Sequence, residues 1–381
     1  MFDLATHYRD HVQEIVDLTT ALANFETPTG SKTHVDQLAA FIEAELTRLG
    51  AHIQREPREA VGDILLAKWN AERPGKPIMF MMHMDTVWPL GTLAQRPVHI
   101  EGDRLIGPGT YDMKASIALV LTCIRTLKEH NLFPDRSIWA LFTSDEETGS
   151  LHSWDYIEQI ARQVGLALVM EFASKDEGLK TWRKGLAQYQ VAVKGKSSHA
   201  GNAPDKGVNA VVELAHQTLR LTGLNALERG TSVSVTVVQG GGATNVIPDA
   251  AMAKIDVRFT TKAEAERVDA AILGLTPVLP GAEIHAEKKT ARPPMEHNDM
   301  MIRCYEQAKA IAARHGMALP EDGSGGGSDG NITAAMGIPT LDGLGSHGEG
   351  AHAINEQCLI PSLARRAVLL SAMIREWEFA E

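Results

Sequence analysis

Short apolar runs alternate with amphipathic stretches through the first half of this chain of 381 residues. The runs "GDILLAKW", "KPIMFMMH", "SIWALFT" and "GLALVMEF" have the length and composition of buried strands. Amphipathic helices are predicted at "SKTHVDQLAAFIEAELTRLG" and "SIALVLTCIRTLKEH". Strands that alternate with helices imply an α/β sheet with helices on both of its faces.

The pattern changes between residues 185 and 294. There the predicted elements follow the order β-α-β-β-α-β, which is that of the ferredoxin-like split unit. A helix, the strand "IPTLD" and a C-terminal helix then resume the first pattern. We therefore predict a discontinuous large α/β domain, residues 1–184 and 295–381, interrupted by a small α+β domain at 185–294.

Composition excludes several classes of protein. The formal net charge is −11 and the chain has no Lys/Arg cluster, which argues against nucleic-acid binding. No apolar run is as long as a membrane span, and the polar N-terminus does not resemble a signal peptide. Cys123, Cys304 and Cys358 are widely spaced and form no CxxC pair, so we expect a reducing, cytoplasmic environment.

Five segments place His, Asp or Glu at the C-terminal ends of predicted strands or in the loops that follow. Open α/β sheets bind ligands at this edge. The residues are His83 and Asp85 in "MMHMDTV", Asp112 in "GPGTYDMKAS", Glu146 and Glu147 in "SDEETGS", Glu171 in "MEF" and His352 in "GEGAHAINE". Imidazole nitrogens and carboxylate oxygens are zinc ligands, and two histidines with several carboxylates suit two divalent ions better than one.

Each segment also has a plainer interpretation. A histidine and an aspartate at a strand end commonly form a polar pair, and adjacent glutamates commonly lie on a solvated face. An aspartate after glycines is commonly a helix N-cap. The metal interpretation is favoured because five such segments occur at the strand ends of one predicted sheet.

The order of "HMDTV", "GPGTYDMK", "SDEETGS", "MEF", "GKSSHAG", "GGGATNVIPD", "DVRF" and "AHAINE" resembles the dizinc metallopeptidase family. That family includes acetylornithine deacetylase, succinyl-diaminopimelate desuccinylase, aminoacylases and carboxypeptidase G. The resemblance covers nearly the whole chain, and "ARPPME" with "GSGGGSDGN" makes it most similar to bacterial glutamate carboxypeptidases. It implies a homodimer in which residues 185–294 serve as the lid and dimerisation domain.

The resemblance also implies a set of metal ligands and a general base. Asp112 would bridge two Zn²⁺ ions, with Co²⁺ or Mn²⁺ as substitutes in vitro, and the Asp112–Met113 peptide would be cis. The remaining ligands would be His83 and Glu171 for one ion, and Glu147 and His352 for the other. Glu146 would act as general base, and Asp85 would hydrogen-bond the far ring nitrogen of His83.

Substrate recognition is implied in the same way. His199 in "SSHAG" would donate a hydrogen bond to the developing oxyanion in the partner subunit's active site. Asn245, Arg258 and Arg292 would hold the terminal carboxylate of the substrate, together with backbone N–H groups near Gly327. From pattern alone, Arg258 is more typical of a solvent-facing charged row.

The implied activity is zinc-dependent hydrolysis of an amide bond next to a free carboxylate, which releases a C-terminal amino acid such as glutamate. An aminoacylase or N-acyl-amino-acid deacylase shares this chemistry and differs only in its N-acyl amino acid substrate. A non-catalytic binding protein would have a broken ligand set, whereas all five ligands and Glu146 are present. A nucleotide binder built on "GPGTYD" is disfavoured because its glycines do not follow GxGxxG spacing.

Overall fold

The computed structural model describes residues 2–379, which separate into two compact units. Unit 1 contains the residues up to Thr181, residues 297–323 and those from Ser328 onward, and unit 2 contains Trp182–Glu296 and Ser324–Gly327. The sequence prediction placed Ser324–Gly327 in the large domain, which is wrong. This glycine-rich segment packs with unit 2 because Arg183 Nη1 donates to the carbonyl oxygens of Gly326 and Gly327, each at 3.3 Å.

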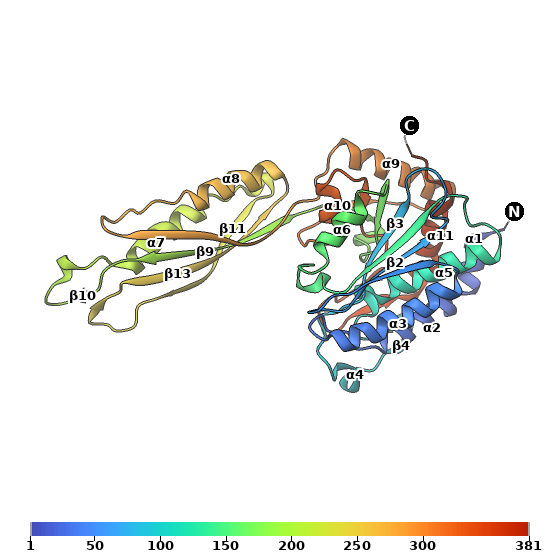
Figure 1. Cartoon of the computed structure of the whole chain (residues 1–381), viewed down its shortest axis with the longest axis horizontal. Helices are drawn as coiled ribbons and strands as arrows, with labels where there is room; N and C mark the ends of the chain where they lie inside the picture. The colour runs from blue at the N-terminus through green and yellow to red at the C-terminus, as the bar shows by residue number, and fades with distance from the viewer. Residues whose placement is uncertain (1, 380–381) are drawn as a thin grey trace. The chain divides into compact units, whose positions relative to one another are not determined.

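Unit 1 is built on a six-stranded sheet (Figure 1). Its strands, in order across the sheet, are β1 (His52–Glu56), β2 (Ile64–Trp69), β6 (Ile138–Thr143), β3 (Ile78–His83), β7 (Leu166–Val169) and β16 (Thr340–Leu341). The last four run parallel to one another, β2 pairs antiparallel with β6, and β1 pairs antiparallel with β2. After β3 the chain adds β6 on one side and β7 on the other, so the C-terminal end of β3 is a topological switch point, where such sheets bind ligands.

Helices cover both faces of this sheet, which confirms the predicted α/β fold. One face packs against α2 (Val12–Ala23), α3 (Lys32–Arg48), α5 (Ala115–Glu129), α9 (Asp299–Arg314) and α11 (Ile360–Glu376). The other packs against α6 (Trp154–Ala161) and α10 (Gly330–Ala335). Alternate residues of β6 enter the two cores: Ala140 and Phe142 lie in the first, and Trp139 and Leu141 in the second.

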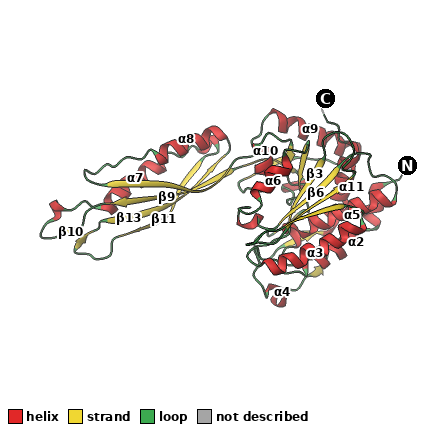
Figure 2. Ribbon diagram, viewed as in Figure 1, coloured by secondary structure: helices red, strands yellow, loops and turns green. Residues whose placement is uncertain are grey.

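Unit 2 has the ferredoxin-like order that its sequence predicts (Figure 2). Its elements are β9 (Gly185–Lys194), α7 (Ala210–Thr222), β11 (Ser232–Gly240), β13 (Ala250–Phe259), α8 (Lys262–Leu273) and β14 (Glu283–Arg292). The antiparallel sheet has the order β11-β13-β9-β14. Ile255 and Val257 of β13 are buried in its core, and the intervening Asp256 and Arg258 are only partly buried.

Short elements complete the fold. In unit 1 these are α1 (Leu4–Asp10), α4 (Thr92–Gln95), β4 (His99–Glu101), β5 (Arg104–Ile106), β17 (Gly348–Glu349) and β18 (Gln357–Leu359), with β10 (Ser198–His199) and β12 (Val246–Ile247) in unit 2. Strands β8 (Leu179–Arg183) and β15 (Glu321–Ser324) pair with each other.

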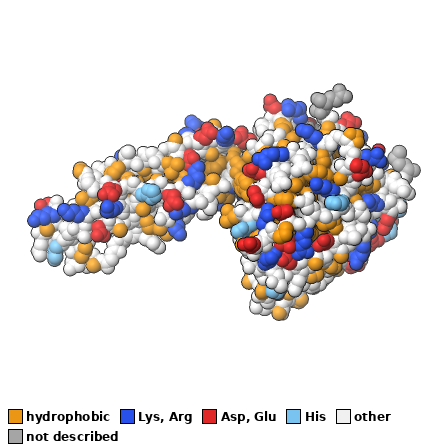
Figure 3. Space-filling view, viewed as in Figure 1, with side chains coloured by type: hydrophobic (Ala, Val, Ile, Leu, Met, Phe, Trp, Pro, Cys, Tyr) orange, Lys and Arg blue, Asp and Glu red, His pale blue; other side chains and the backbone are white. Residues whose placement is uncertain are grey.

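Two of the sequence expectations concern the helices of the chain and the surface charge of unit 1. Within residues 2–379, no helix combines the length and the apolar character needed to span a bilayer. On the face of unit 1 seen in Figure 3, acidic and basic side chains are interspersed rather than gathered by sign.

Candidate active site

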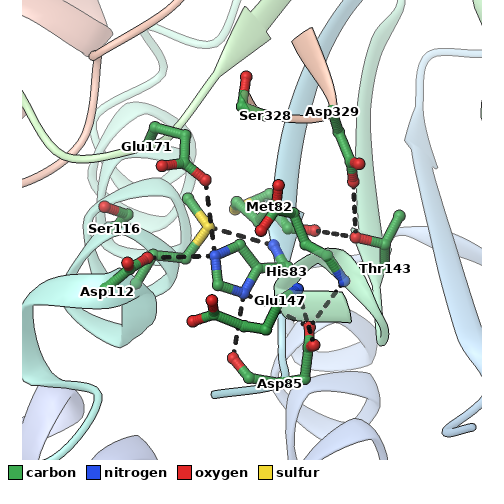
Figure 4. A network of polar contacts seen from close by, with 12 residues as sticks. Met82, His83, Asp85, Asp112, Ser116, Thr143, Glu147, Glu171, Ser328 and Asp329 are labelled. Carbon is green, nitrogen blue, oxygen red and sulfur yellow. Dashed lines mark hydrogen bonds and ion pairs between the residues drawn. The ribbon is translucent and has the colours of Figure 1, made fainter. Parts of the chain in front are cut away.

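His83, the last residue of β3, lies at the centre of a buried polar cluster (Figure 4). Its Nε2 atom is 3.2 Å from Asp112 Oδ1 and 3.5 Å from Glu171 Oε1. Glu171 follows the neighbouring parallel strand β7, and Asp112 lies in the turn that enters α5. The parallel register of the sheet thus brings together residues that are far apart in the chain.

His352 approaches the same aspartate from the opposite side. Its Nε2 atom is 3.3 Å from Asp112 Oδ2 and 3.0 Å from Glu147 Oε2. Each oxygen of Asp112 therefore faces one histidine, as a bridging carboxylate would. The His352 side chain is 55% exposed and that of His83 is 2% exposed, so the His352 side of the cluster is the one open to solvent. The Asp112–Met113 peptide is cis, as the resemblance implies.

Asp85 holds two parts of the cluster together. Its backbone carbonyl lies 3.0 Å from His83 Nδ1, and its carboxylate is farther away, at 3.5 Å. The carboxylate instead accepts hydrogen bonds from the backbone N–H groups of Glu146, at 3.3 Å, and Glu147, at 3.2 Å, and from the hydroxyl of Thr29, at 2.7 Å. Asp85 therefore orients the His83 ring mainly through its carbonyl and uses its carboxylate to fix the turn of the two glutamates.

Glu146 and Glu147 begin a 3₁₀ turn, Glu146–Thr148, just after β6. Their carboxylates reach different partners in the cluster. Potential ligand atoms of Glu147, His83 and Asp112 lie within 4.8 Å of one another, and so do those of Glu146, His83 and Glu171. One strand end thus delivers two carboxylates to the two sides of His83.

The histidines of the cluster hold protons strongly. Burial opposes protonation of His83, but hydrogen bonds to Asp112, Asp85 and Glu171 outweigh burial and raise its pKa well above the ordinary value. Hydrogen bonds to Asp112 and Glu147 raise the pKa of His352 to about 10. Burial raises the pKa of Glu147 to about 7. Hydrogen bonds to the surrounding carboxylates therefore raise the pKa of the two imidazoles, whereas burial raises that of Glu147.

Divalent ions suit this donor set. The oxygens of Asp112, Glu147 and Glu171 converge on the Nε2 atoms of the two histidines, where a cation would replace their protons. Glu147 Oε1 is buried and finds no hydrogen-bond partner among residues 2–379. A buried carboxylate oxygen is costly without a partner, and a metal ion would satisfy it.

The sequence interpretation missed Glu356, which is fully buried behind this cluster. Its carboxylate accepts hydrogen bonds from the backbone N–H groups of Tyr111 and Asp112, both at 3.1 Å, and of Gly109 at 2.9 Å. A signal was present, because a glycine-rich loop such as "GPGTYD" can turn its N–H groups toward an anion. Here the anion is the carboxylate of Glu356, a residue of the same chain.

The residues expected to bind substrate fall into two groups within unit 2. His199 and Asn245 are neighbours, since the N–H of Ala200 donates to the Asn245 carbonyl at 2.9 Å. Arg258 and Arg292 both pair with Leu186, from opposite sides of β9. β9 runs about 26 Å from Leu186 to Lys194, at 3.3 Å per residue, and β10 with His199 lies beyond that end (Figure 1). Within a single chain, Asn245 is therefore too far from both arginines to share one carboxylate with them, and its role in substrate binding stays a prediction.

The two arginines differ in their surroundings. Arg258 is held by Asp256 of its own strand, with Nε to Oδ1 at 2.8 Å and Nη2 to Oδ2 at 3.2 Å. Arg292 is 5% exposed and packs against Gly327, where an added methyl group would come within 2.9 Å of Arg292 Cδ. Arg183, which the sequence interpretation did not single out, is also buried beside this glycine segment.

His199 has a defined tautomer in this structure. Its Nδ1 atom accepts hydrogen bonds from the backbone N–H groups of Gly201 and Asn202, both at 3.1 Å. The ring proton of a neutral His199 must therefore sit on Nε2, so that atom is a hydrogen-bond donor.

The sequence and the fold are both similar to those of known peptidases. Residues 79–376 match the model of "Peptidase family M20/M25/M40". The chain is 33% identical to carboxypeptidase G2 of Pseudomonas sp. (strain RS-16) over 386 residues, which cover 99% of this chain and 91% of that protein. Among solved structures, aminopeptidase PepT from Bacillus cereus superposes with a TM-score of 0.81 at 24% identity, covering 96% of this chain and 98% of that one. The YxeP protein of Bacillus subtilis, described as a dinuclear metal-binding peptidase, superposes with a TM-score of 0.70 at 15% identity, covering 96% and 98%.

Proposed function

Because this chain belongs to peptidase family M20/M25/M40, we propose that it is a dizinc carboxypeptidase that releases a C-terminal glutamate or similar amino acid. Membership of this family makes it a hydrolase of peptide or amide bonds. The observation that carries the proposal is the position of Asp112, whose two carboxylate oxygens face His83 and His352. The full-length similarity to carboxypeptidase G2 supports the substrate class.

The metal ligands would divide into two sets that share Asp112. His83 and Glu171 would complete one set, and Glu147 with His352 the other. Two Zn²⁺ ions bound there would make a hydroxide available near neutral pH and polarise the scissile carbonyl.

Glu146 would be the general base. It enters the cluster beside His83 and Glu171, and its backbone is fixed by the carboxylate of Asp85. Its carboxylate would take the proton of the attacking water and pass it to the leaving amine nitrogen, which must be protonated to depart. The paired glutamates therefore divide two roles, ligand for Glu147 and proton carrier for Glu146.

Recognition of the free carboxylate would rest on Arg292 and Arg258. The Arg292 guanidinium is largely buried beside Gly327, where a charge-assisted hydrogen bond to a carboxylate is strong. Arg258, which Asp256 of the same strand holds in place, would share this role. An aminoacylase would need the same clamp and stays the second candidate, as an N-acyl-amino-acid deacylase.

A substrate panel tests this proposal together with metal analysis. We expect the purified protein to carry two equivalents of zinc and to hydrolyse folate-type and N-acyl-glutamate substrates faster than dipeptides or neutral N-acyl amino acids. Preference for neutral N-acyl amino acids would establish the aminoacylase instead. A metal-free protein that hydrolyses none of them after zinc addition would overturn the enzyme assignment.

We also propose that the enzyme is a homodimer in which His199 and Asn245 serve the partner's active site. The length of β9 separates them from Arg258 and Arg292 within one chain. Unit 2 carries apolar side chains that a second copy could cover: Leu219 of α7 is 73% exposed, and Val238 of the edge strand β11 is 58% exposed.

Mixing two inactive variants tests the dimer. His199→Ala and Glu146→Gln subunits are dissociated together and allowed to re-associate. A mixed dimer has one complete site, so random pairing should restore about one quarter of wild-type activity. No recovery from the mixture, with both variants still dimeric, would show that His199 acts within its own chain.

A cytoplasmic location is proposed on the state of the cysteines. Cys123, Cys304 and Cys358 are all buried and unbridged. Free thiols are typical of a reducing compartment. Cell fractionation of the source organism, followed by immunodetection, would test this proposal.

A further inference from the structure

Glu356 is fully buried, and its carboxylate accepts hydrogen bonds from four N–H donors. Its Oε1 atom accepts from the backbone N–H groups of Tyr111 and Asp112, and Oε2 accepts from that of Gly109 and from Trp88 Nε1, at 2.5 Å. Four donors converge on one carboxylate, which is unusual for a side chain that only fills space.

The donors form an anion-binding nest in the glycine-rich loop. Gly109 has a φ of 72°, in the left-handed region, which turns its N–H and those that follow toward one point. Loops of this kind bind phosphate in other proteins. Here the internal carboxylate occupies that position, which explains why "GPGTYD" resembles a nucleotide-binding loop without being one.

Three ligand-bearing segments meet at this carboxylate. Trp88 belongs to the loop that follows His83 and Asp85, and Asp112 is held through its own backbone N–H. His352 lies in the same loop as Glu356, where backbone hydrogen bonds from Ala353 to Gly350 and from Glu356 to Ala353 form two successive tight turns. These turns link the position of the His352 ring to that of Glu356.

We propose that Glu356 is a positioning residue that anchors the Asp112 loop to the His352 loop and thereby sets the spacing of these two metal ligands. Two residues of the His352 loop then hold Asp112. Glu356 accepts a hydrogen bond from its backbone N–H, and His352 contacts its carboxylate. This role rests on the proposed metal centre, and it concerns metal affinity and geometry rather than contact with substrate.

Only an acceptor-rich group can fill the nest. Glutamine has the same shape, but its NH₂ group would face two of the four donors. Buried donors left without acceptors are unfavourable, so the loop should move to find other partners. Partners that orient metal ligands typically change metal affinity or activity by about 10–100-fold when removed.

The test is isothermal titration of the metal-free full-length protein with Zn²⁺, comparing wild type, Glu356→Gln and Glu349→Gln. Glu349 lies on β17 beside the same loop, and its side chain is 61% exposed, so its variant is a matched control for the loss of one negative charge. We expect one of two zinc-binding steps to weaken by about 10–100-fold in Glu356→Gln, with kcat reduced and KM nearly unchanged. Glu349→Gln should behave as wild type.

A second variant and a second measurement keep the test valid if Glu356→Gln folds poorly. Trp88→Phe removes one donor and leaves the carboxylate, so it should weaken the same step by a smaller factor. Hydrogen exchange of the Tyr111 and Asp112 amides should become faster in Glu356→Gln, with the core of α5 unchanged.

The outcomes separate this role from the metal centre itself. If wild type binds two zinc ions and Glu356→Gln binds them equally well, the positioning role is wrong even if its melting temperature falls. If wild type binds no zinc, the proposed metal centre is wrong and this role is wrong with it. Weakening of a single step in both Glu356→Gln and Trp88→Phe would support the proposal.

Discussion

The charged side chains of the two units are arranged differently. In unit 1, Asp112, Glu147 and Glu171 are largely buried and converge on two histidines. In unit 2, opposite charges form ion pairs, some within one element, as Asp256–Arg258 and Glu264–Arg267, and others between neighbouring elements, as Lys194–Glu283.

Burial of carboxylates is unfavourable unless cations or hydrogen-bond donors compensate it. The pairs of unit 2 achieve this compensation locally. The cluster of unit 1 leaves a buried oxygen of Glu147 without a partner among residues 2–379. The comparison indicates that the sheet edge of unit 1 is arranged for bound cations, and that the charges of unit 2 mainly stabilise its own fold.

The largest effect is expected at Glu146. Glu146→Gln should lower kcat by about 10²–10⁴-fold, because the attacking water loses its proton acceptor. Its zinc content, measured by atomic absorption, should equal that of wild type. Activity close to wild type would remove Glu146 from the mechanism.

Glu147→Gln should fail differently, by losing metal. Its carboxylate contacts His352 and has a buried oxygen without a partner among the described residues, so it should contribute directly to metal binding. We expect the zinc affinity to fall by more than the roughly 10–100-fold typical of outer partners, and excess zinc should partly restore activity. Identical zinc binding in Glu146→Gln and Glu147→Gln would contradict the division of roles between them.

The third prediction concerns the contact of Arg292 with Gly327. Gly327→Ala would place a methyl group about 2.9 Å from Arg292 Cδ, so the guanidinium must shift. A weakened charged hydrogen bond is worth about 1.5–3 kcal/mol, so KM should rise by up to about 100-fold with kcat little changed.

Gly325→Ala is the matched control for this prediction. Among the described residues, no atom lies within 4 Å of a methyl group added at Gly325, and the same segment would carry the change. Its KM should remain that of wild type. Equal effects of the two substitutions would show that the segment, and not its contact with Arg292, controls substrate binding.

A smaller effect is expected on the pH dependence of stability in unit 2. Hydrogen bonds from Arg267 and Thr231 lower the pKa of Glu264 to about 2, from an ordinary value of 4.5. A lowered folded-state pKa means that the stabilisation is complete above about pH 4.5 and is lost as pH falls toward 2. Glu264→Gln should therefore cost about 1–2 kcal/mol at pH 7, and its stability should fall less than that of wild type between pH 5 and pH 3.

Chemical denaturation at pH 7, 5 and 3 would measure this difference. Glu266→Gln on the same helix is the control, because the Glu266 side chain is 68% exposed. Parallel stability curves for wild type and Glu264→Gln over this range would refute the assigned pKa shift.

The smallest effect is expected at an exposed pair of unit 2. Lys194 Nζ lies 3.2 Å from Glu283, and the two side chains are 72% and 71% exposed. Glu283→Gln should change the free energy of unfolding by less than about 1 kcal/mol and leave zinc binding unaltered, because solvent screens exposed pairs. A change in zinc affinity would weaken the contrast between the two units.

Local sequence patterns were enough to predict the fold class and the main elements. Alternation with a period of two in β6 and β13, and helical spacing in α3 and α5, arise from backbone geometry within a few residues. The same patterns located strand ends, and therefore the segments that carry His83, Glu147 and Glu171. Such local signals do not depend on what packs against them.

Contacts between distant segments were beyond local pattern. The nest around Glu356, the placement of the Asp85 carboxylate against the turn of Glu146, and the separation of Asn245 from Arg292 each depend on strand register or on which loops meet. These contacts cannot be predicted from residue types at a fixed spacing, because the packing of the whole unit determines which distant residues meet. The segments that meet in the polar cluster could therefore be predicted from the chain, but the contacts that support them required the folded structure.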